Sequence, residues 1–155
     1  MDTGRAFLGG EAAFNPALIA VQKRAAAFTG LPWTHSECLQ LVSYHAGQHF
    51  ALHTDYFDEV SAVTFCASCL GRASERRPLF LCLQGDEGTD LAAGQRVFTG
   101  LIYLNDEFDG GTTDFPALNR SFAPRKGSMV LWRNVDHAMV PVRTNAHCRC
   151  GSVVS

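Results

Sequence analysis

The residues of this chain best placed to do chemistry form the tripeptide His53-Thr54-Asp55. If this segment is a strand, positions i and i+2 project from the same face, so one imidazole and one carboxylate can point at a single metal ion. His137, which lies far downstream and follows an apolar run, is the best candidate for a second imidazole. Two histidines and one carboxylate on one face of an octahedron leave three positions open, and this ligand set recurs in non-haem Fe(II) oxygenases.

A second histidine pattern overlaps the first. His45, His49 and His53 recur every four residues, which on a helix would align them in one stripe. A zinc-protease helix of the His-Glu-x-x-His type needs a glutamate where Phe50 stands, so this interpretation lacks its general base. We therefore expect His45 and His49, like His35, to be surface or loop residues.

The six cysteines offer a different metal chemistry. Cys66 and Cys69 form a Cys-x-x-Cys pair, and Cys148 with Cys150 could complete a zinc site. The second pair has one intervening residue, fewer than structural zinc sites use, so a zinc-stapled binding domain is the weaker alternative. A disulfide framework would suit a short secreted chain, but no signal-peptide pattern is visible. We expect reduced, mostly buried thiols.

Length and charge restrict the function classes. The 155 residues suit one domain, and the net charge of −2 gives no electrostatic footprint for nucleic acid. No stretch provides the ~20 consecutive apolar residues that a membrane span needs. A cytoplasmic protein is the default expectation, and the oligomeric state is not indicated.

The elements that must position the site follow from the hydrophobic pattern. Asn15 as N-cap, Pro16 in the first turn and Gly30 after the last predict a helix over residues 15–29. Apolar and β-branched runs between glycine and proline turns predict strands at about 39–44, 50–54, 97–104 and 128–132. Many short strands after one helix are typical of a mostly-β (α+β) barrel or jelly roll. The stretch 56–94 has no clear period and is interpreted as a long insertion or lid.

Six motifs follow one another in a fixed order. They are Tyr44-His45-Ala46-Gly47-Gln48, His53-Thr54-Asp55, Arg96-Val97-Phe98-Thr99 with Tyr103-Leu104-Asn105, Gly110-Gly111-Thr112-Thr113-Asp114-Phe115-Pro116, Pro124-Arg125-Lys126-Gly127, and His137-Ala138-Met139-Val140-Pro141-Val142. In this order they resemble the catalytic domain of the prolyl 4-hydroxylase family of 2-oxoglutarate- and Fe(II)-dependent dioxygenases. The resemblance covers roughly residues 16–55 and 94–142. It implies a double-stranded β-helix (jelly roll) with an N-terminal supporting helix, in a single domain over residues 1–155.

The resemblance also implies a reaction and its residues. His53, Asp55 and His137 would bind Fe(II), and Tyr44 and Thr99 would lie beside 2-oxoglutarate. The implied reaction hydroxylates a proline in a peptide or protein substrate, consumes O2, and releases succinate and CO2. Ascorbate is expected as the cofactor that restores oxidised iron.

The C-terminal segment departs from the family pattern. The family places a lysine after the second histidine, where it pairs with the far carboxylate of 2-oxoglutarate, and the matching position here is His147. Arg149 would share a strand face with His147, and arginine can bind a carboxylate through two hydrogen bonds. Arg149 is therefore the expected substitute, with Arg143 as the other candidate. Because the chain ends at Ser155, inside what we interpret as the last strand, we expect a truncated C-terminus. The alternative function is a catalytically impaired jelly-roll remnant that acts as a binding or interaction module.

Overall fold

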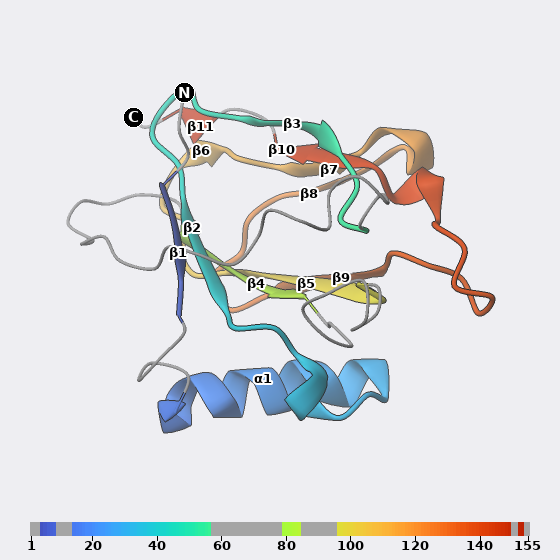
Figure 1. Ribbon diagram of the computed structural model, residues 1–155. Coiled ribbons are helices and arrows are strands. Elements are labelled where there is room, and N and C mark those ends of the chain that lie inside the picture. Colours follow the sequence, from blue (N-terminus) through green and yellow to red (C-terminus); the bar gives the residue numbers. More distant parts are fainter. Residues whose placement is uncertain (1–3, 9–13, 57–78, 85–95, 150–151, 154–155) are drawn as a thin grey trace.

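The computed structural model describes residues 4–8, 14–56, 79–84, 96–149 and 152–153. The predicted helix is confirmed as α1 (Pro16–Thr29), which lies below two layers of strands (Figure 1). The side chain of Asn15 caps it by accepting a hydrogen bond from the backbone N–H of Ala17 at 2.9 Å. Gly30, at a φ of 75°, ends the helix in the left-handed conformation that glycine adopts without steric cost.

The sheet next to the helix contains five antiparallel strands. Their spatial order is β1 (Gly4–Phe7), β2 (Gln40–Ser43), β4 (Leu79–Gln84), β5 (Phe98–Tyr103) and β9 (Met129–Arg133). Ala25 of α1 and Leu39, just before β2, are buried together between helix and sheet. Partly buried hydrophobic side chains surround this pair: Leu8, Leu18, Val21, Ile102 and Met129. The apolar side of the helix therefore covers the outer face of this sheet.

The second sheet lies on the side of the first sheet opposite to α1 (Figure 1). Its order is β3 (Phe50–His53), β10 (His147–Arg149), β7 (Thr113–Phe115) and β8 (Arg120–Phe122), all antiparallel. A separate pair is formed by β6 (Asp109–Gly110) and β11 (Ser152–Val153). Three 3-10 turns complete the described elements: η2 (Trp33–His35), η3 (Pro116–Leu118) and η4 (Arg143–Asn145).

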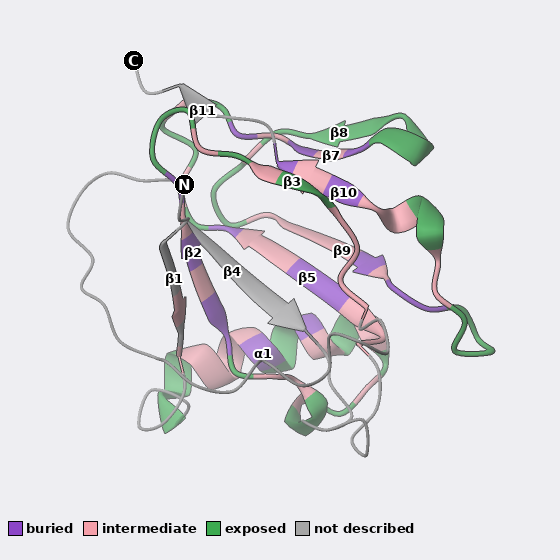
Figure 2. Ribbon diagram, turned by 45° about the horizontal axis from the view of Figure 1, so that its top comes forward, coloured by how far each residue is buried: buried purple, intermediate pink, exposed green. Residues whose placement is uncertain are grey.

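The space between the two sheets holds a mixed aromatic and polar core. Buried residues occur in β2, β5, β7, β9 and β10 (Figure 2). The hydroxyl of Tyr103 in β5 donates to Thr113 of β7 at 2.8 Å, which ties one sheet to the other. Trp132, expected in the core, is buried there and packs edge to face on Phe115 at 5.3 Å. Trp33 is only half-buried and lies beneath the ammonium of Lys23.

Within the stretch 56–94, the described residues form a strand that the sequence pattern did not indicate. Strand β4 runs through it and pairs with β2 on one side and β5 on the other. The rest of the expected insertion after Tyr56, with Cys66 and Cys69, lies outside the described residues, as does Cys150. Cys38 and Cys148 are free thiols. No helix in the described ranges is both long enough and apolar enough to span a membrane.

Candidate metal centre

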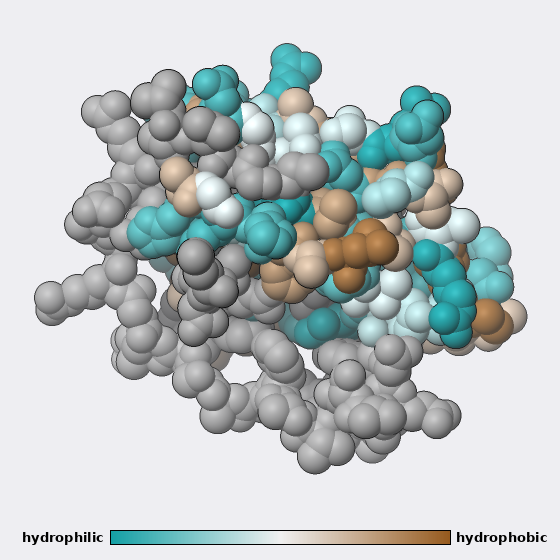
Figure 3. All heavy atoms as spheres, turned by 90° about the horizontal axis from the view of Figure 1, so that it is seen from above, coloured by the Kyte–Doolittle hydropathy of each residue, from teal (hydrophilic) through white to brown (hydrophobic). Residues whose placement is uncertain are grey.

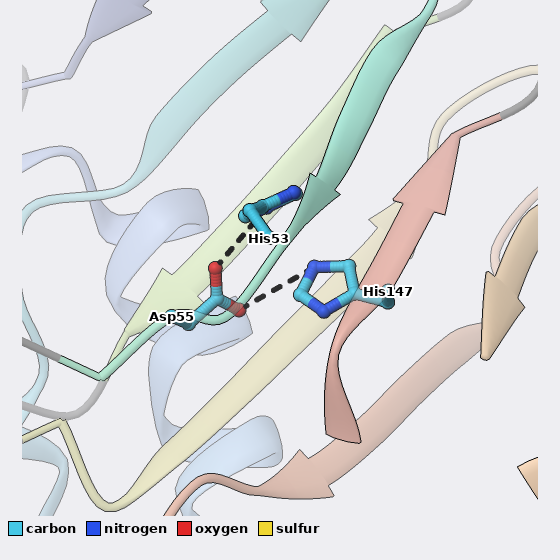
Figure 4. Close-up of side chains that lie close together, drawn as sticks. All are labelled: His53, Asp55 and His147. Carbon is cyan, nitrogen blue, oxygen red and sulfur yellow. Dashed lines mark ion pairs between the residues drawn. The ribbon is translucent and has the colours of Figure 1, made fainter. Parts of the chain in front are cut away.

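Three side chains that can ligate a metal converge at one end of the second sheet (Figure 4). His53 is the last residue of β3, Asp55 follows two residues later, and His147 is the first residue of β10. One ligand atom from each side chain lies within 4.8 Å of the other two. The side chain of His53 is 30% exposed, and that of its neighbour Leu52, which points to the opposite face of the strand, is exposed. Seen from this side, the described surface is mainly hydrophilic, with a few small hydrophobic areas (Figure 3).

Both imidazole rings are held in the same tautomer. The Nδ1 of His53 lies 2.8 Å from the carbonyl oxygen of Ala51, and the Nδ1 of His147 lies 3.1 Å from that of Asn145. Because a carbonyl can only accept, each Nδ1 carries a proton, which leaves Nε2 as the nitrogen of each ring that can bind a metal. The Nε2 atoms face different oxygens of Asp55, at 3.5 Å for His53 and 3.7 Å for His147. A backbone carbonyl that fixes Nδ1–H is the usual support of a metal-ligating histidine.

The charge states of these groups suit a cation. Burial alone raises the pKa of Asp55, but the hydrogen bond from His53, the charges of His147 and His53, and the hydroxyl of Thr99 together bring it below its usual value. Burial lowers the pKa of His147. At neutral pH the carboxylate is therefore ionised and the His147 ring is neutral. Asp55 Oδ2 is buried without a hydrogen-bond partner among the described atoms, which fits an oxygen that serves as a metal ligand.

His137, the predicted third ligand, is placed elsewhere. It is exposed in the turn after β9, with its Nδ1 3.4 Å from the Arg133 guanidinium. Asp136 holds this turn, because its Oδ1 accepts from the backbone N–H groups of Ala138 at 2.8 Å and Val140 at 2.9 Å. The turn folds back on itself, and the structure does not bring His137 together with His53 and Asp55.

His147 joins His53 and Asp55 in the candidate ligand group because β10 is the strand that pairs with β3. Cα register places His147 opposite His53, and their ring centroids are 4.3 Å apart. Sequence reasoning considered His147 only as the position of the family lysine. The signal that could have identified it is the spacing of His147 and Arg149, which repeats on β10 the i, i+2 pattern of His53 and Asp55.

Aromatic rings enclose the two imidazoles. The ring of His147 packs against Trp132 at 4.7 Å and Phe115 at 5.3 Å, and the ring of His53 packs against Phe50 at 4.0 Å. These contacts limit the rotamers of the histidines and keep bulk water away from their inner faces.

Arg149, the residue expected from the sequence to bind the far carboxylate of the co-substrate, is the last residue of β10. It is only 6% exposed, and its guanidinium stacks over the ring of Tyr44 at 4.6 Å. Burial lowers its pKa to about 10, against the opposing effects of Tyr44 and Tyr103, so it stays charged at neutral pH. The other candidate, Arg143, is exposed in η4.

A glycine forms the wall beside this cation. Gly111 has a φ of +65°, and a Cβ built on it would lie 2.8 Å from Nη2 of Arg149 and 2.7 Å from the ring of Phe108. The close approach of the backbone to the guanidinium therefore requires glycine at this position.

Thr99 is 1% exposed on the inner face of β5, and its hydroxyl oxygen accepts from the side-chain amide of Asn134 at 2.8 Å. Asn134 follows β9 and carried no sequence signal that pointed to the site.

Residues 39–151 match the family model of the 2OG-Fe(II) oxygenase superfamily. The chain is 34% identical over 114 residues to Probable prolyl 4-hydroxylase 3 of Arabidopsis thaliana. This alignment covers 74% of this chain and 29% of that protein. It is 27% identical over 140 residues to the human prolyl 4-hydroxylase subunit alpha-1, and this alignment covers 90% of this chain and 22% of that subunit. The chain thus spans less than a third of the length of these relatives.

A solved structure has the same fold. The viral collagen prolyl hydroxylase of Paramecium Bursaria Chlorella virus-1, in its 2OG complex, aligns with a TM-score of 0.67 at 18% identity, over 99% of this chain and 74% of that one. This likeness confirms the predicted jelly-roll fold. With the match of the family model over most of its length, the chain belongs to the 2OG-Fe(II) oxygenase superfamily.

Proposed function

We propose that this chain is a prolyl 4-hydroxylase-type dioxygenase that hydroxylates a proline in a peptide or protein substrate, consumes O2 and 2-oxoglutarate, and releases succinate and CO2. The observation that carries the proposal is the convergence of His53, Asp55 and His147 on one point. The named activity of the relatives supports the substrate class.

Fe(II) is the metal that this donor set suits. Two imidazole nitrogens and one carboxylate oxygen are the ligands of mononuclear non-haem Fe(II) oxygenases, and they leave positions open for other ligands. His53, Asp55 and His147 would hold the ion. When bound, the iron supplies the activation of O2, which no amino-acid side chain can perform. The protein's part is to keep Asp55 ionised, through the neighbouring histidines and Thr99, and to keep the buried His147 ring neutral, while the carbonyls of Ala51 and Asn145 hold the two rings with Nε2 toward Asp55.

Arg149 would bind the far carboxylate of 2-oxoglutarate. His147 and Arg149 are two residues apart on β10, which corresponds to about 6.6 Å along a strand, since each residue advances the chain by about 3.3 Å. This spacing suits a short dicarboxylate with its keto-acid end at the metal and its other end at the guanidinium. Tyr44, stacked beneath the guanidinium, would complete that end of the site. Ascorbate is proposed as the reductant that keeps the iron in the ferrous state.

The decisive experiment measures succinate. The full chain is incubated with Fe(II), 2-oxoglutarate and O2, with and without a proline-rich peptide, beside the Asp55→Ala variant. We expect iron-dependent succinate formation that the peptide stimulates and that Asp55→Ala abolishes, together with hydroxyproline in the peptide. If no succinate forms above background and 2-oxoglutarate does not bind in an Fe(II)-dependent manner, the enzyme proposal is wrong and the impaired jelly-roll remnant replaces it.

A further inference from the structure

Strand β3 is irregular where it pairs with β10. His53 lies opposite His147 and Phe50 lies opposite Arg149, so three steps along β3 match two steps along β10. The extra residue falls in the dipeptide Ala51-Leu52, which has no Cα partner in this register. An extra residue on one strand of an antiparallel pair is a β-bulge, and bulges bend the strand and re-aim side chains next to active sites.

The bulge determines which side chains of β3 face inward. Side chains three residues apart in a regular strand point to opposite faces. The rings of Phe50 and His53 nevertheless lie 4.0 Å apart, and Phe50 packs against a buried cluster that includes Tyr44 and Tyr103. The dipeptide Ala51-Leu52 between them is exposed. The extra residue therefore keeps both Phe50 and His53 on the inner face of the sheet.

The bulge also lies at the carbonyl that holds the His53 ring. The Nδ1 of His53 is 2.8 Å from the carbonyl oxygen of Ala51, two residues earlier. In an extended strand, residues two apart are separated by about 6.6 Å along the chain, so a straight strand keeps such a carbonyl away from the ring. The bend at a bulge shortens this separation. With Nδ1 held, the Nε2 of His53 faces Asp55 at 3.5 Å.

Resting on the proposed iron site, we propose that the β-bulge at Ala51-Leu52 positions His53, and that the Ala51 carbonyl fixes the imidazole with Nε2 directed at the metal. An outer partner that orients a ligating histidine typically accounts for about 10- to 100-fold in metal affinity. Here the partner is a backbone carbonyl. The positioning therefore depends on the number of residues between Phe50 and His53 and not on the side chain of Ala51.

The test removes the extra residue by deletion of Leu52. Phe50 and His53 are then two residues apart, so both still face inward and can keep their partners on β10 without a bulge. The full chain is titrated without 2-oxoglutarate with Co(II), which such ligands bind more tightly than Fe(II). We expect the deletion to weaken Co(II) binding by about 10- to 100-fold. Leu52→Ala is the matched control, because it changes only an exposed side chain and should leave the affinity unchanged.

A second measurement reports on the ring itself without any metal. NMR of the imidazole nitrogens, at about pH 8 and so above the usual pKa of imidazole, shows which nitrogen of His53 carries the proton. The proton should be on Nδ1 in the unmodified chain and in Leu52→Ala. After deletion of Leu52 it should move toward Nε2, the tautomer that free histidine prefers. A purely structural role of the bulge would not change the tautomer.

The outcomes separate this proposal from the proposed function. If the deletion variant binds Co(II) as tightly as the unmodified chain and keeps the proton on Nδ1, the positioning role is wrong while the metal site stands. If the unmodified chain fails to bind Co(II), the iron site is wrong, and the tautomer alone decides the role of the bulge.

A further variant applies if the deletion variant fails to fold by circular dichroism. Leu52 is then replaced by the α-hydroxy acid with the same side chain. This change turns the carbonyl of Ala51 into an ester carbonyl, which is a weaker hydrogen-bond acceptor, and leaves every side chain in place. Weaker Co(II) binding by the ester variant supports the positioning role, and unchanged binding overturns it.

Discussion

His53 and His147 lie directly opposite each other in the antiparallel pair of β3 and β10, with their ring centroids 4.3 Å apart. This register brings an imidazole from β10, far downstream in the sequence, to the His-x-Asp motif. A slip of one residue would turn His147 to the other face of the sheet. The pairing of two short strands thus determines whether the metal centre exists.

The first prediction concerns the third ligand. His147→Ala should weaken Co(II) binding by more than about 100-fold, because loss of a direct ligand exceeds the roughly 10- to 100-fold cost of losing an outer partner. His137→Ala should leave binding unchanged, since His137 lies in an exposed turn beside Arg133. Titration of both variants with Co(II) checks this. If His137→Ala weakens Co(II) binding and His147→Ala does not, His137 and not His147 is the third metal ligand.

The second prediction concerns Arg149. Arg149→Leu should weaken 2-oxoglutarate binding by about 10- to 100-fold, since hydrogen bonds to a charged group are worth roughly 1.5–3 kcal/mol. Arg149→Lys should give an intermediate loss, because lysine keeps the charge but lacks the planar fork. Calorimetric titration of the metal-loaded chain measures this. The exposed Arg143, changed to leucine, is the matched control. Full affinity in Arg149→Leu would show that another group holds the carboxylate.

The third prediction uses the glycine wall. Gly111→Ala should weaken 2-oxoglutarate binding while Co(II) binding is retained, because the new methyl group would collide with the Arg149 guanidinium. Gly127→Ala introduces a methyl group at a similar φ of +80° with nothing within 4 Å, so it carries the backbone cost without the collision. Each substitution should lower stability by roughly 1–2 kcal/mol, the cost of the left-handed conformation. If both variants bind 2-oxoglutarate with equal affinity, the close approach of Gly111 to the Arg149 guanidinium does not matter for co-substrate binding.

The fourth prediction concerns pH and stability without metal. Burial lowers the pKa of His147 below 6.5, so the unfolded chain binds more protons at this residue than the native state does. The resulting stability is present above pH 6.5 and is lost as the pH falls toward the native pKa. The pKa of Asp55 is also lowered in the native state, so this residue too contributes stability that is lost as the pH falls, but only below the usual pKa of 3.8.

We therefore expect the free energy of unfolding in urea, with EDTA present, to decrease between about pH 7 and pH 5. His147→Gln, which cannot be protonated, should show a shallower decrease. Identical slopes in the two proteins would mean that His147 is not desolvated in the native state.

Much of the fold could be predicted from local sequence signals. The cap at Asn15 and the stop at Gly30 predicted α1. The His-x-Asp spacing indicated His53 and Asp55 as neighbouring ligands, although Asp55 lies beyond the end of β3 and not within the strand. His147 could not be assigned in this way, because its role depends on which strand pairs with β3, a long-range choice. Strand β4 lay in a stretch with no period, and the contact of Asn134 with Thr99 joins residues far apart in the sequence.

Strand β10 has only three residues, and its first and last side chains would serve the metal and the far end of the co-substrate. A ligand that fixes the position of His147 also fixes that of Arg149, because both residues belong to this short strand. Binding of Fe(II) and of 2-oxoglutarate should therefore be positively cooperative, and by thermodynamic linkage each must raise the affinity for the other by the same factor.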